Sequence, residues 1–208
     1  MSMAEMVMRK FYRQAEAQPE RLPWHREEPS AMLAAVVSAR NGQGRALDVG
    51  SGAGVLSVWM AQRGMDVTGL DLFPEAVAMA RAVAERKGVK VEFVCGDLYK
   101  YEPERPFDVV YDSGCLHSLI GGDLASYKRQ VLRWLAPAGD YVLEHWGKRH
   151  ALDWRPIGPR RRTEASVQRL FAPELTLVRS EAEDFDAPLP FGPRVRGVAY
   201  RFARASTS

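Results

Sequence analysis

The stretch that decides the fold is ALDVGSGAG, residues 46–54, which is followed by VTGLD, residues 67–71. The first stretch is an apolar run that ends in an acid, Asp48, and a glycine-rich turn. An amphipathic segment separates it from the second apolar run, which ends at Asp71. This order predicts a strand, a tight turn facing a nucleotide-like ligand, a helix, and a second strand whose terminal carboxylate can reach a ribose.

The spacing of the glycines separates two cofactor classes. Gly50, Gly52 and Gly54 follow the pattern GxGxG, whereas dinucleotide-binding turns usually follow GxGxxG and face a pyrophosphate. Asp48 stands two residues before the first glycine, where its carboxylate would repel a pyrophosphate but suits a ligand with an ammonium group. The glycines allow positive φ and close backbone approach in either case. The pattern therefore disfavours a nicotinamide-dependent oxidoreductase.

On these residues the chain resembles the class I S-adenosylmethionine-dependent methyltransferases, whose first motif has the form of residues 47–54. Further acids follow in the family's order, namely Asp71, Asp97 after a third apolar run and Asp112 after a fourth. The resemblance implies that Asp71 accepts from the ribose hydroxyls and Asp97 from the adenine amino group. It places Asp112 where cofactor and substrate meet. Each acid alone could simply cap a helix or turn, but the ordered set favours a cofactor site.

The expected cofactor is S-adenosylmethionine, with S-adenosylhomocysteine as its product. Open α/β sheets bind ligands at the carboxyl ends of their strands, so the expected contacts come from strand ends and from one loop before the first strand. The predicted cofactor-binding residues are Trp24, Asp48, Gly50, Ser51, Gly52, Gly54, Asp71, Leu72, Gly96, Asp97, Leu98, Asp112 and Ser113.

Alternating helix and strand patterns predict an α/β fold, and the resemblance implies that it is the Rossmann-like class I methyltransferase fold. Its sheet is expected to be seven-stranded and mostly parallel, with helices on both faces and an antiparallel C-terminal strand pair. The predicted helices are 3–17, 30–40, 55–63, 74–88, 123–135 and 163–171. The predicted strands are 46–49, 66–70, 91–95, 108–112, 141–144, 175–180 and 195–202. All 208 residues are assigned to a single domain, with N-terminal helices and a lid (1–44), a cofactor core (45–146) and a substrate-side segment (147–208).

Composition narrows the expected partners. The net charge of +3 over 208 residues gives little support to the alternative of an RNA or protein methyltransferase. No apolar run reaches membrane-spanning length, and the start is a mixed polar helix rather than a signal peptide. Cys95 and Cys115 are expected to be reduced thiols. These features predict a cytoplasmic protein with a small-molecule acceptor and no nucleic-acid or membrane partner, and they leave the oligomeric state open.

The acceptor side is less defined by the sequence. The Trp24 loop and YDSGCLH, residues 111–117, resemble the thiopurine- and tellurite-methyltransferase-like branch of small-molecule methyltransferases. An oxygen or nitrogen nucleophile needs a base, whereas a thiolate needs little beyond positioning. The candidate bases are His117, and His145 or Glu144, since a histidine titrates near neutral pH.

A metal site is not predicted, because no acid cluster accompanies Asp112 in the expected loop. Arg160, Arg161 and Arg162 form either a solvated surface or a contact for an anionic substrate. A cofactor-binding protein that has lost catalysis stays open as an alternative to an enzyme, because the acids say nothing about the chemical step.

Overall fold

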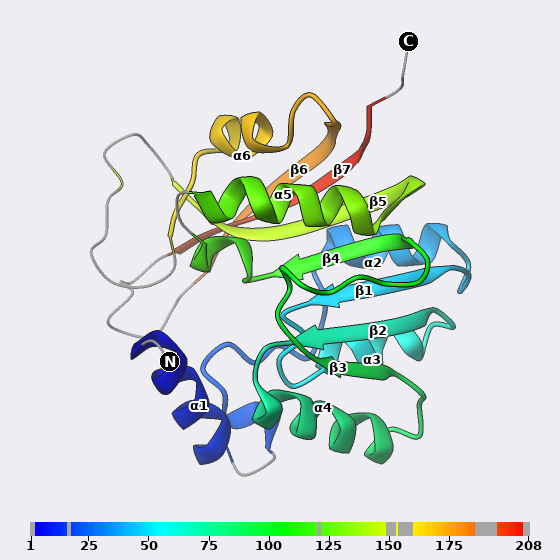
Figure 1. Cartoon of the computed structure of the whole chain (residues 1–208), viewed down its shortest axis with the longest axis vertical. Helices are drawn as coiled ribbons and strands as arrows, with labels where there is room; N and C mark the ends of the chain where they lie inside the picture. Colours follow the sequence, from blue (N-terminus) through cyan, green and yellow to red (C-terminus); the bar gives the residue numbers. More distant parts are fainter. Residues whose placement is uncertain are drawn as a thin grey trace.

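The computed structural model describes residues 3–15, 18–119, 122–148, 153, 160–185 and 195–205. One seven-stranded sheet organises them, in the order β3-β2-β1-β4-β5-β7-β6 (Figure 1). The strands are β1 (Arg45–Val49), β2 (Asp66–Asp71), β3 (Glu92–Cys95), β4 (Phe107–Ser113), β5 (Leu135–Gly147), β6 (Leu175–Phe185) and β7 (Val195–Arg204). Pairs from β3 through β5 are parallel, and β7 is antiparallel to both β5 and β6, so the predicted fold class is confirmed.

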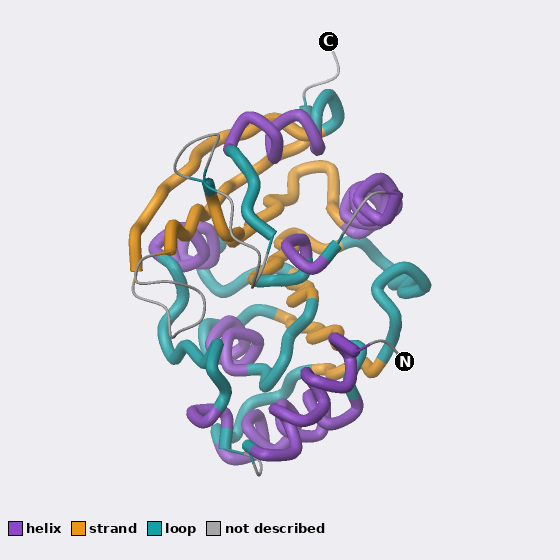
Figure 2. Tube along the Cα trace, turned by 90° about the vertical axis from the view of Figure 1, so that its left-hand side faces the viewer, coloured by secondary structure: helices purple, strands orange, loops and turns teal. Residues whose placement is uncertain are grey.

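Helices cover both faces of this sheet, as the edge-on view in Figure 2 shows. They are α1 (Met3–Gln14), α2 (Ala31–Ala39), α3 (Val55–Ala61), α4 (Pro74–Arg86), α5 (Gly122–Trp134) and α6 (Glu164–Phe171), with short 3-10 turns η1 (Pro19–Arg21) and η2 (Leu116–Ser118). One apolar cluster joins α2 and α3 to one face of the sheet, and a larger cluster joins α5 and α6 to the other. Among the described residues, no helix has the length and apolar character needed to cross a bilayer.

Local capping chemistry explains several helix starts. Ser30 accepts a hydrogen bond from the Leu33 amide at 3.1 Å and begins α2, and Thr163 accepts one from the Ser166 amide and begins α6. Pro74 occupies the first turn of α4, where its missing N–H costs nothing. Each of these starts agrees with the sequence prediction.

Other predicted bounds are wrong. The first helix ends at Gln14 rather than at residue 17, and α5 begins at Gly122, so Asp123 lies inside its first turn instead of capping it. The fifth strand is 135–147 rather than 141–144, because the chain passes directly from α5 into pairing with β4 at Leu135. The predicted strand 175–180 extends to residue 185 through its pairing with β7. Residues 186–194, which connect β6 to β7, lie outside the described residues.

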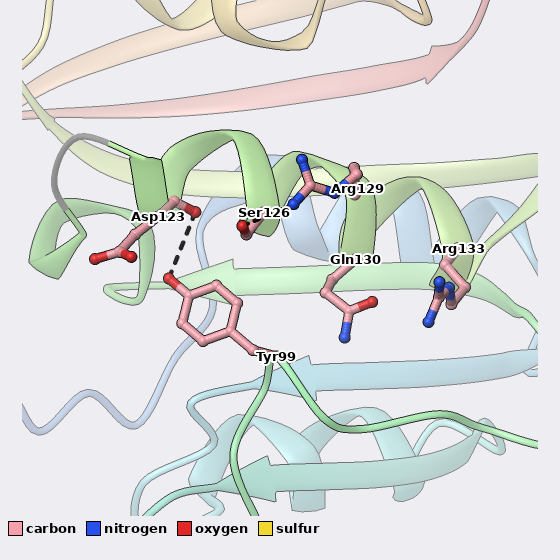
Figure 3. Close-up of a pocket in the computed structure, with 6 residues that line it drawn as sticks. All are labelled: Tyr99, Asp123, Ser126, Arg129, Gln130 and Arg133. Atoms are coloured by element: carbon pink, nitrogen blue, oxygen red, sulfur yellow. Dashed lines mark hydrogen bonds between the residues drawn. The ribbon is translucent and has the colours of Figure 1, made fainter.

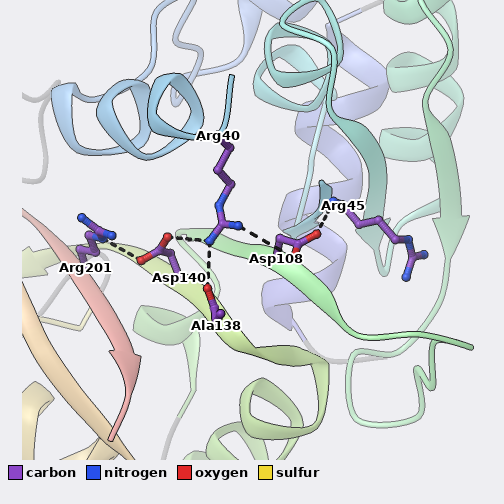
Figure 4. Close-up of polar contacts among 6 residues, drawn as sticks. All are labelled: Arg40, Arg45, Asp108, Ala138, Asp140 and Arg201. Carbon is purple, nitrogen blue, oxygen red and sulfur yellow. Dashed lines mark hydrogen bonds and ion pairs between the residues drawn. The ribbon is translucent and has the colours of Figure 1, made fainter. Parts of the chain in front are cut away.

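An ion-pair network lies at the end of the sheet opposite the carboxyl ends of the strands, which bind ligands in such folds (Figure 4). The Arg40 guanidinium, just after α2, donates to Asp140 Oδ2 at 2.8 Å and to the Ala138 carbonyl at 3.2 Å. Arg201 of β7 donates to Asp140 Oδ1 at 2.7 Å. Asp140 is only 7% exposed, so both arginines compensate a buried charge. The network joins α2, β5 and β7, and it lies away from the carboxyl ends of the strands.

Strand order places that site. The chain moves outward from β1 to β2 and β3, then returns to pair β4 with the other side of β1. The carboxyl ends of β1 and β4 therefore flank a point where the winding direction changes, which is where open α/β sheets bind ligands. In Figure 1, α1 lies on the side to which the arrowheads of these strands point.

Candidate active site

The glycine turn between β1 and α3 adopts the conformation that its sequence requires. Gly50, Gly52 and Gly54 have φ values of 70°, 54° and 72°, a left-handed region that favours glycine. A Cβ on Gly54 would lie 2.7 Å from the Ala80 Cβ and from a ring carbon of Phe93, so this glycine also lets α3 pack closely on its neighbours. Gly50 is exposed at the start of the turn, whereas Gly52 and Gly54 are buried in it.

Asp71 ends β2 beside that turn. Its carboxylate is 6% exposed and accepts hydrogen bonds from the Gly52 amide at 2.8 Å and the Phe73 amide at 2.9 Å. Burial raises the pKa of Asp71, and the two amides oppose that effect. A carboxylate oxygen can accept two hydrogen bonds, so each Asp71 oxygen retains capacity for a ribose hydroxyl. The next residue, Leu72, is 49% exposed, so an apolar surface stands beside the carboxylate.

Asp48 lies beneath the turn and is 4% exposed. It accepts a hydrogen bond from Ser57 Oγ of α3 at 2.5 Å. Burial raises the pKa of Asp48 to about 7 against the lowering effect of Ser57, and the charges of Asp71 and Asp112 raise it further. A cation entering this region would therefore be attracted by several carboxylates at once.

Residues 96–98 form a turn after β3 that reaches the end of β2. The Gly96 amide donates to the Asp71 carbonyl at 2.9 Å, and Asp97 Oδ1 accepts from the Tyr99 amide at the same distance. Gln130 of α5 donates to the Leu98 carbonyl at 3.0 Å. The structure thus brings the predicted adenine-side residues next to the predicted ribose-side carboxylate. The individual cofactor contacts stay predictions.

Asp112 has a different place from the other acids. It is fully buried, and its carboxylate accepts from the Cys115 amide at 2.6 Å, the Leu116 amide at 3.0 Å and the Tyr127 hydroxyl at 2.5 Å. Burial raises its pKa to about 6 despite these donors. The carboxylate organises the turn after β4 and joins it to α5. Its predicted contact with the cofactor stays untested.

The two candidate histidines lie together. His117 of η2 and His145 of β5 have ring centroids 5.9 Å apart. Burial lowers the pKa of His117 to about 4, and burial together with the charge of His117 lowers that of His145 to about 3. The expectation that either histidine titrates near neutral pH is therefore wrong, because desolvation disfavours the imidazolium. Both rings are neutral at physiological pH and are weak proton acceptors.

The basic run after β5 is only partly free for a ligand. Arg161 pairs with Asp153 at 3.2 Å with both side chains buried, and Arg162 donates to the Leu119 carbonyl at 3.2 Å. The Arg160 amide donates to the His117 carbonyl at 3.1 Å. The Arg160 amide and the Arg162 side chain therefore tie this loop to the turn after β4, Arg161 is buried in its ion pair, and Arg160 as a whole stays exposed.

Tyr12 and Arg26, which the sequence analysis did not select as site residues, both lie close to residues that it did select. A Cβ on Gly52 would lie 3.3 Å from the Tyr12 hydroxyl, so α1 approaches the glycine turn. Trp24 is 40% exposed and packs edge-on against Tyr12, with ring centroids 5.7 Å apart. Arg26, two residues later, donates to Glu144 Oε2. In the sequence, only the position of Arg26 on the same loop as Trp24 pointed to a role for Arg26 at the site.

A separate shallow pocket lies between α5 and the turn after β3 (Figure 3). Its lining is polar, and the Tyr99 hydroxyl donates to the Asp123 carbonyl at 3.5 Å across it. The lining residues are Tyr99, Asp123, Ser126, Arg129, Gln130 and Arg133. None of the predicted cofactor residues belongs to this set.

The residues at the strand ends fit the expected cofactor. Ser51 Oγ, on the glycine turn, is buried and has no hydrogen-bond partner within the described part of the chain. The adjacent Asp71 carboxylate, the exposed Leu72 and the buried Asp48 offer acceptors, an apolar surface and negative charge. A ligand with a ribose, an adenine and a positive charge would satisfy each of these features.

Comparison with known proteins agrees with this geometry. Residues 46–139 match the family model described as a methyltransferase domain. The 2-heptyl-1-hydroxyquinolin-4(1H)-one methyltransferase of Mycobacteroides abscessus is 27% identical over 60% of this chain and 58% of its own length. A ubiquinone biosynthesis O-methyltransferase of Paramagnetospirillum magneticum is 32% identical over 54% of this chain and 49% of its own. The chain thus matches about half the length of these relatives.

Solved structures share the fold. The 1,6-didemethyltoxoflavin-N1-methyltransferase of Burkholderia thailandensis, with its substrate and S-adenosylhomocysteine bound, superposes with a TM-score of 0.67, 24% identity, and coverage of 96% of this chain and 88% of that one. TehB from Haemophilus influenzae gives a TM-score of 0.69 at 16% identity, covering 86% and 64%. The chain shares this fold, and its residues 46–139 match a methyltransferase domain.

Proposed function

We propose that this protein transfers the methyl group of S-adenosylmethionine to a sulfur, oxygen or nitrogen atom of a small molecule. The observation that carries the proposal is the meeting of the Asp71 carboxylate, the Gly52 amide and the Ser51 hydroxyl, which lacks a partner among the described residues, at the ends of β1 and β2. The names of the relatives, which act on a hydroxyquinolone and in ubiquinone biosynthesis, support a small-molecule acceptor.

The chain's residues divide the proposed work between binding and positioning. Asp71 would accept from the ribose hydroxyls, the turn at 96–98 would face the adenine, and the glycine turn would let the backbone approach the rest of the cofactor. S-adenosylmethionine, when bound, supplies a methyl group activated by its sulfonium. The protein must then hold the nucleophile in line and exclude water, which is mostly a matter of orientation.

The acceptor side is proposed to lie over the ends of β4 and β5. Asp112 holds the turn that carries His117, and the Arg160 amide fixes that turn from the other side. His117 is proposed to line the acceptor site as a neutral hydrogen-bonding group. Cys95 and Cys115 are both free thiols, which supports the proposal of a cytoplasmic location, because that compartment keeps thiols reduced.

Two measurements test the function. Calorimetry should show binding of S-adenosylhomocysteine, at micromolar concentration or thereabouts, and no tighter binding of NAD. Transfer of labelled methyl from S-adenosylmethionine should then occur with at least one acceptor from a panel of thiols, phenols and N–H heterocycles. Tighter binding of NAD would contradict the cofactor class. Cofactor binding without transfer to any acceptor class would favour the alternative of an inactive cofactor-binding protein.

A further inference from the structure

An ion pair between two distant parts of the chain lies on the proposed acceptor side of the site. Arg26 of the N-terminal loop donates from Nη1 to Glu144 Oε2 of β5 at 2.5 Å. Ser113, the register partner of Glu144 on β4, lies with its hydroxyl 3.3 Å from the same oxygen. The Glu144 side chain is 10% exposed, whereas that of Arg26 is 46% exposed. One oxygen of the carboxylate is therefore held by two donors.

The other oxygen has no such partner. Glu144 Oε1 is buried and accepts no hydrogen bond within the described part of the chain. A buried carboxylate oxygen without a donor is costly, and a ligand N–H or O–H would remove that cost. The half-exposed Arg26 guanidinium has further N–H groups beyond the one that it gives to Glu144. An acceptor oxygen and additional donors thus stand side by side.

Strand geometry puts this pair on the same side of the sheet as Asp48. Asp48 pairs in register with Tyr111, and Ser113 two residues later pairs with Glu144. Because side chains alternate along a strand, these groups share one face and His145 points to the other. Glu144 and Arg26 therefore approach the site from the side of Asp48, and the two histidines approach from the opposite side.

We propose that Arg26 and Glu144 together bind the reacting edge of the methyl acceptor. Glu144 Oε1 accepts the N–H or O–H of the nucleophilic atom, and Arg26 donates to an oxygen next to that atom in the acceptor. The acceptor class is a small ring compound with an N–H or O–H beside, or conjugated to, a carbonyl or phenolate oxygen. The inference rests on the proposed methyltransferase function and adds the acceptor class and the residue that receives the proton.

The step balances without a further reactant. The N–CH3 or O–CH3 bond forms as the S–CH3 bond breaks, and the electron pair of the broken bond stays on sulfur. The nucleophile's proton passes to Glu144 Oε1. One positive charge is lost at sulfur while the Arg26–Glu144 pair, neutral at the start, gains one. The ion pair requires the carboxylate form, which is the form that accepts a proton.

The test uses the full-length protein and three substitutions. Glu144→Gln removes the proton acceptor, Arg26→Gln removes the donor to the neighbouring oxygen, and Glu27→Gln is the matched control. Glu27 lies on the same loop, and its side chain is 84% exposed. The acceptor probes are 2-hydroxyquinoline, in which the N–H stands beside the carbonyl, phenol and thiophenol, with labelled S-adenosylmethionine at about pH 7.5. Calorimetry with S-adenosylhomocysteine reports whether each variant is folded and binds cofactor.

The expected results differ between probes. Glu144→Gln should lower kcat with 2-hydroxyquinoline by about 10²–10⁴-fold, as removal of a proton acceptor does. It should lower the rate with thiophenol, which is already a thiolate at this pH, by no more than about threefold, since positioning alone then suffices. Arg26→Gln should raise the KM for 2-hydroxyquinoline about tenfold or more. Glu144→Asp should recover part of the lost kcat, and Glu27→Gln should match the wild type.

Several outcomes would overturn the proposal. Equal kcat of wild type and Glu144→Gln with 2-hydroxyquinoline would remove Glu144 from the reaction, and so would equal losses with thiophenol. A wild-type protein that binds S-adenosylhomocysteine but methylates only thiophenol would overturn the acceptor class alone. Binding of S-adenosylhomocysteine with transfer to no probe would overturn the proposed function in favour of an inactive cofactor-binding protein. Failure of the wild type to bind S-adenosylhomocysteine would also overturn the proposed function. If Glu144→Gln does not fold, the comparison of Glu144→Asp with Glu27→Gln decides the same question.

Discussion

Replacing Asp48 with asparagine should stabilise the empty protein and weaken its cofactor binding. Asp48 is 4% exposed, and its pKa is raised from 3.8 to about 7, chiefly by burial. Between these two values the unfolded chain releases the proton while the folded chain keeps it. The free energy of unfolding therefore falls as pH rises through this window and levels off above about pH 8.

The magnitude follows from the shift. A displacement of about 3 pKa units corresponds to about 4 kcal/mol at about 1.36 kcal/mol per unit. The asparagine side chain in Asp48→Asn carries no charge, and its amide oxygen could still accept from Ser57 Oγ. The stability difference between Asp48→Asn and wild type should thus grow from near zero at about pH 4 to about 4 kcal/mol above about pH 8.

Urea denaturation of both proteins at several values between about pH 4 and about pH 8.5 measures this difference. Asp66→Asn is the matched control, because the Asp66 side chain is 73% exposed, whereas Asp48 is buried. A stability difference that stays constant with pH would refute the reasoning, since only a titrating group produces the slope. Calorimetry at about pH 8 should meanwhile show weaker binding of S-adenosylmethionine to Asp48→Asn by about 1.5–3 kcal/mol, the range for a charged hydrogen bond.

Other parts of the site give predictions of the same kind. Asp71→Ala should weaken S-adenosylhomocysteine binding by about 1–3 kcal/mol in calorimetry, because ribose hydroxyls lose their acceptor, and unchanged affinity would remove the ribose assignment. Limited proteolysis at Arg21 and Arg26 should slow when S-adenosylhomocysteine is added if the N-terminal segment through Pro29 acts as a lid, and equal rates would contradict that. His117 and His145 should contribute a loss of stability between about pH 7 and about pH 5 that opposes the gain from Asp48, because their pKa values of about 4 and about 3 leave them neutral while the unfolded chain binds protons below about pH 6.5. In urea titrations His117→Gln should therefore gain stability relative to wild type from about pH 7 to about pH 5, and a constant difference would contradict this role of His117.

The cofactor side of the site could be predicted from the sequence because its geometry is local. Asp48 and Asp71 each end a buried strand, and parallel strands bring their carboxyl ends to one edge of the sheet. The glycine spacing then specifies a backbone conformation that other residues rarely adopt, and the observed φ values agree with it. Each inference needed only a strand, its last residue and the parallel pairing.

The acceptor side could not be predicted in the same way. Arg26 and Glu144 are 118 residues apart, and nothing in the sequence near either residue specifies the other. The pKa values of the histidines depend on burial against Trp146 and the turn after β4, which the motif around His117 does not encode. Asp112 also lies at the expected strand end, but its carboxylate accepts a hydrogen bond from Tyr127, a residue of α5. Tertiary packing, not local pattern, decides these three cases.

The placement of the carboxylates has a consequence for turnover. Asp48 is buried near Asp71, Asp112 and Glu144, whose charges each raise its pKa, so this side of the sheet favours a positive ligand. Methyl transfer turns a sulfonium into a neutral thioether, which these acids hold less strongly. If the acids attracted the sulfonium itself strongly, they would stabilise bound S-adenosylmethionine before transfer, and the chemical step would then be slower. Loss of charge on transfer therefore weakens product binding relative to substrate binding, and Asp48→Asn should reduce the preference of the protein for S-adenosylmethionine over S-adenosylhomocysteine.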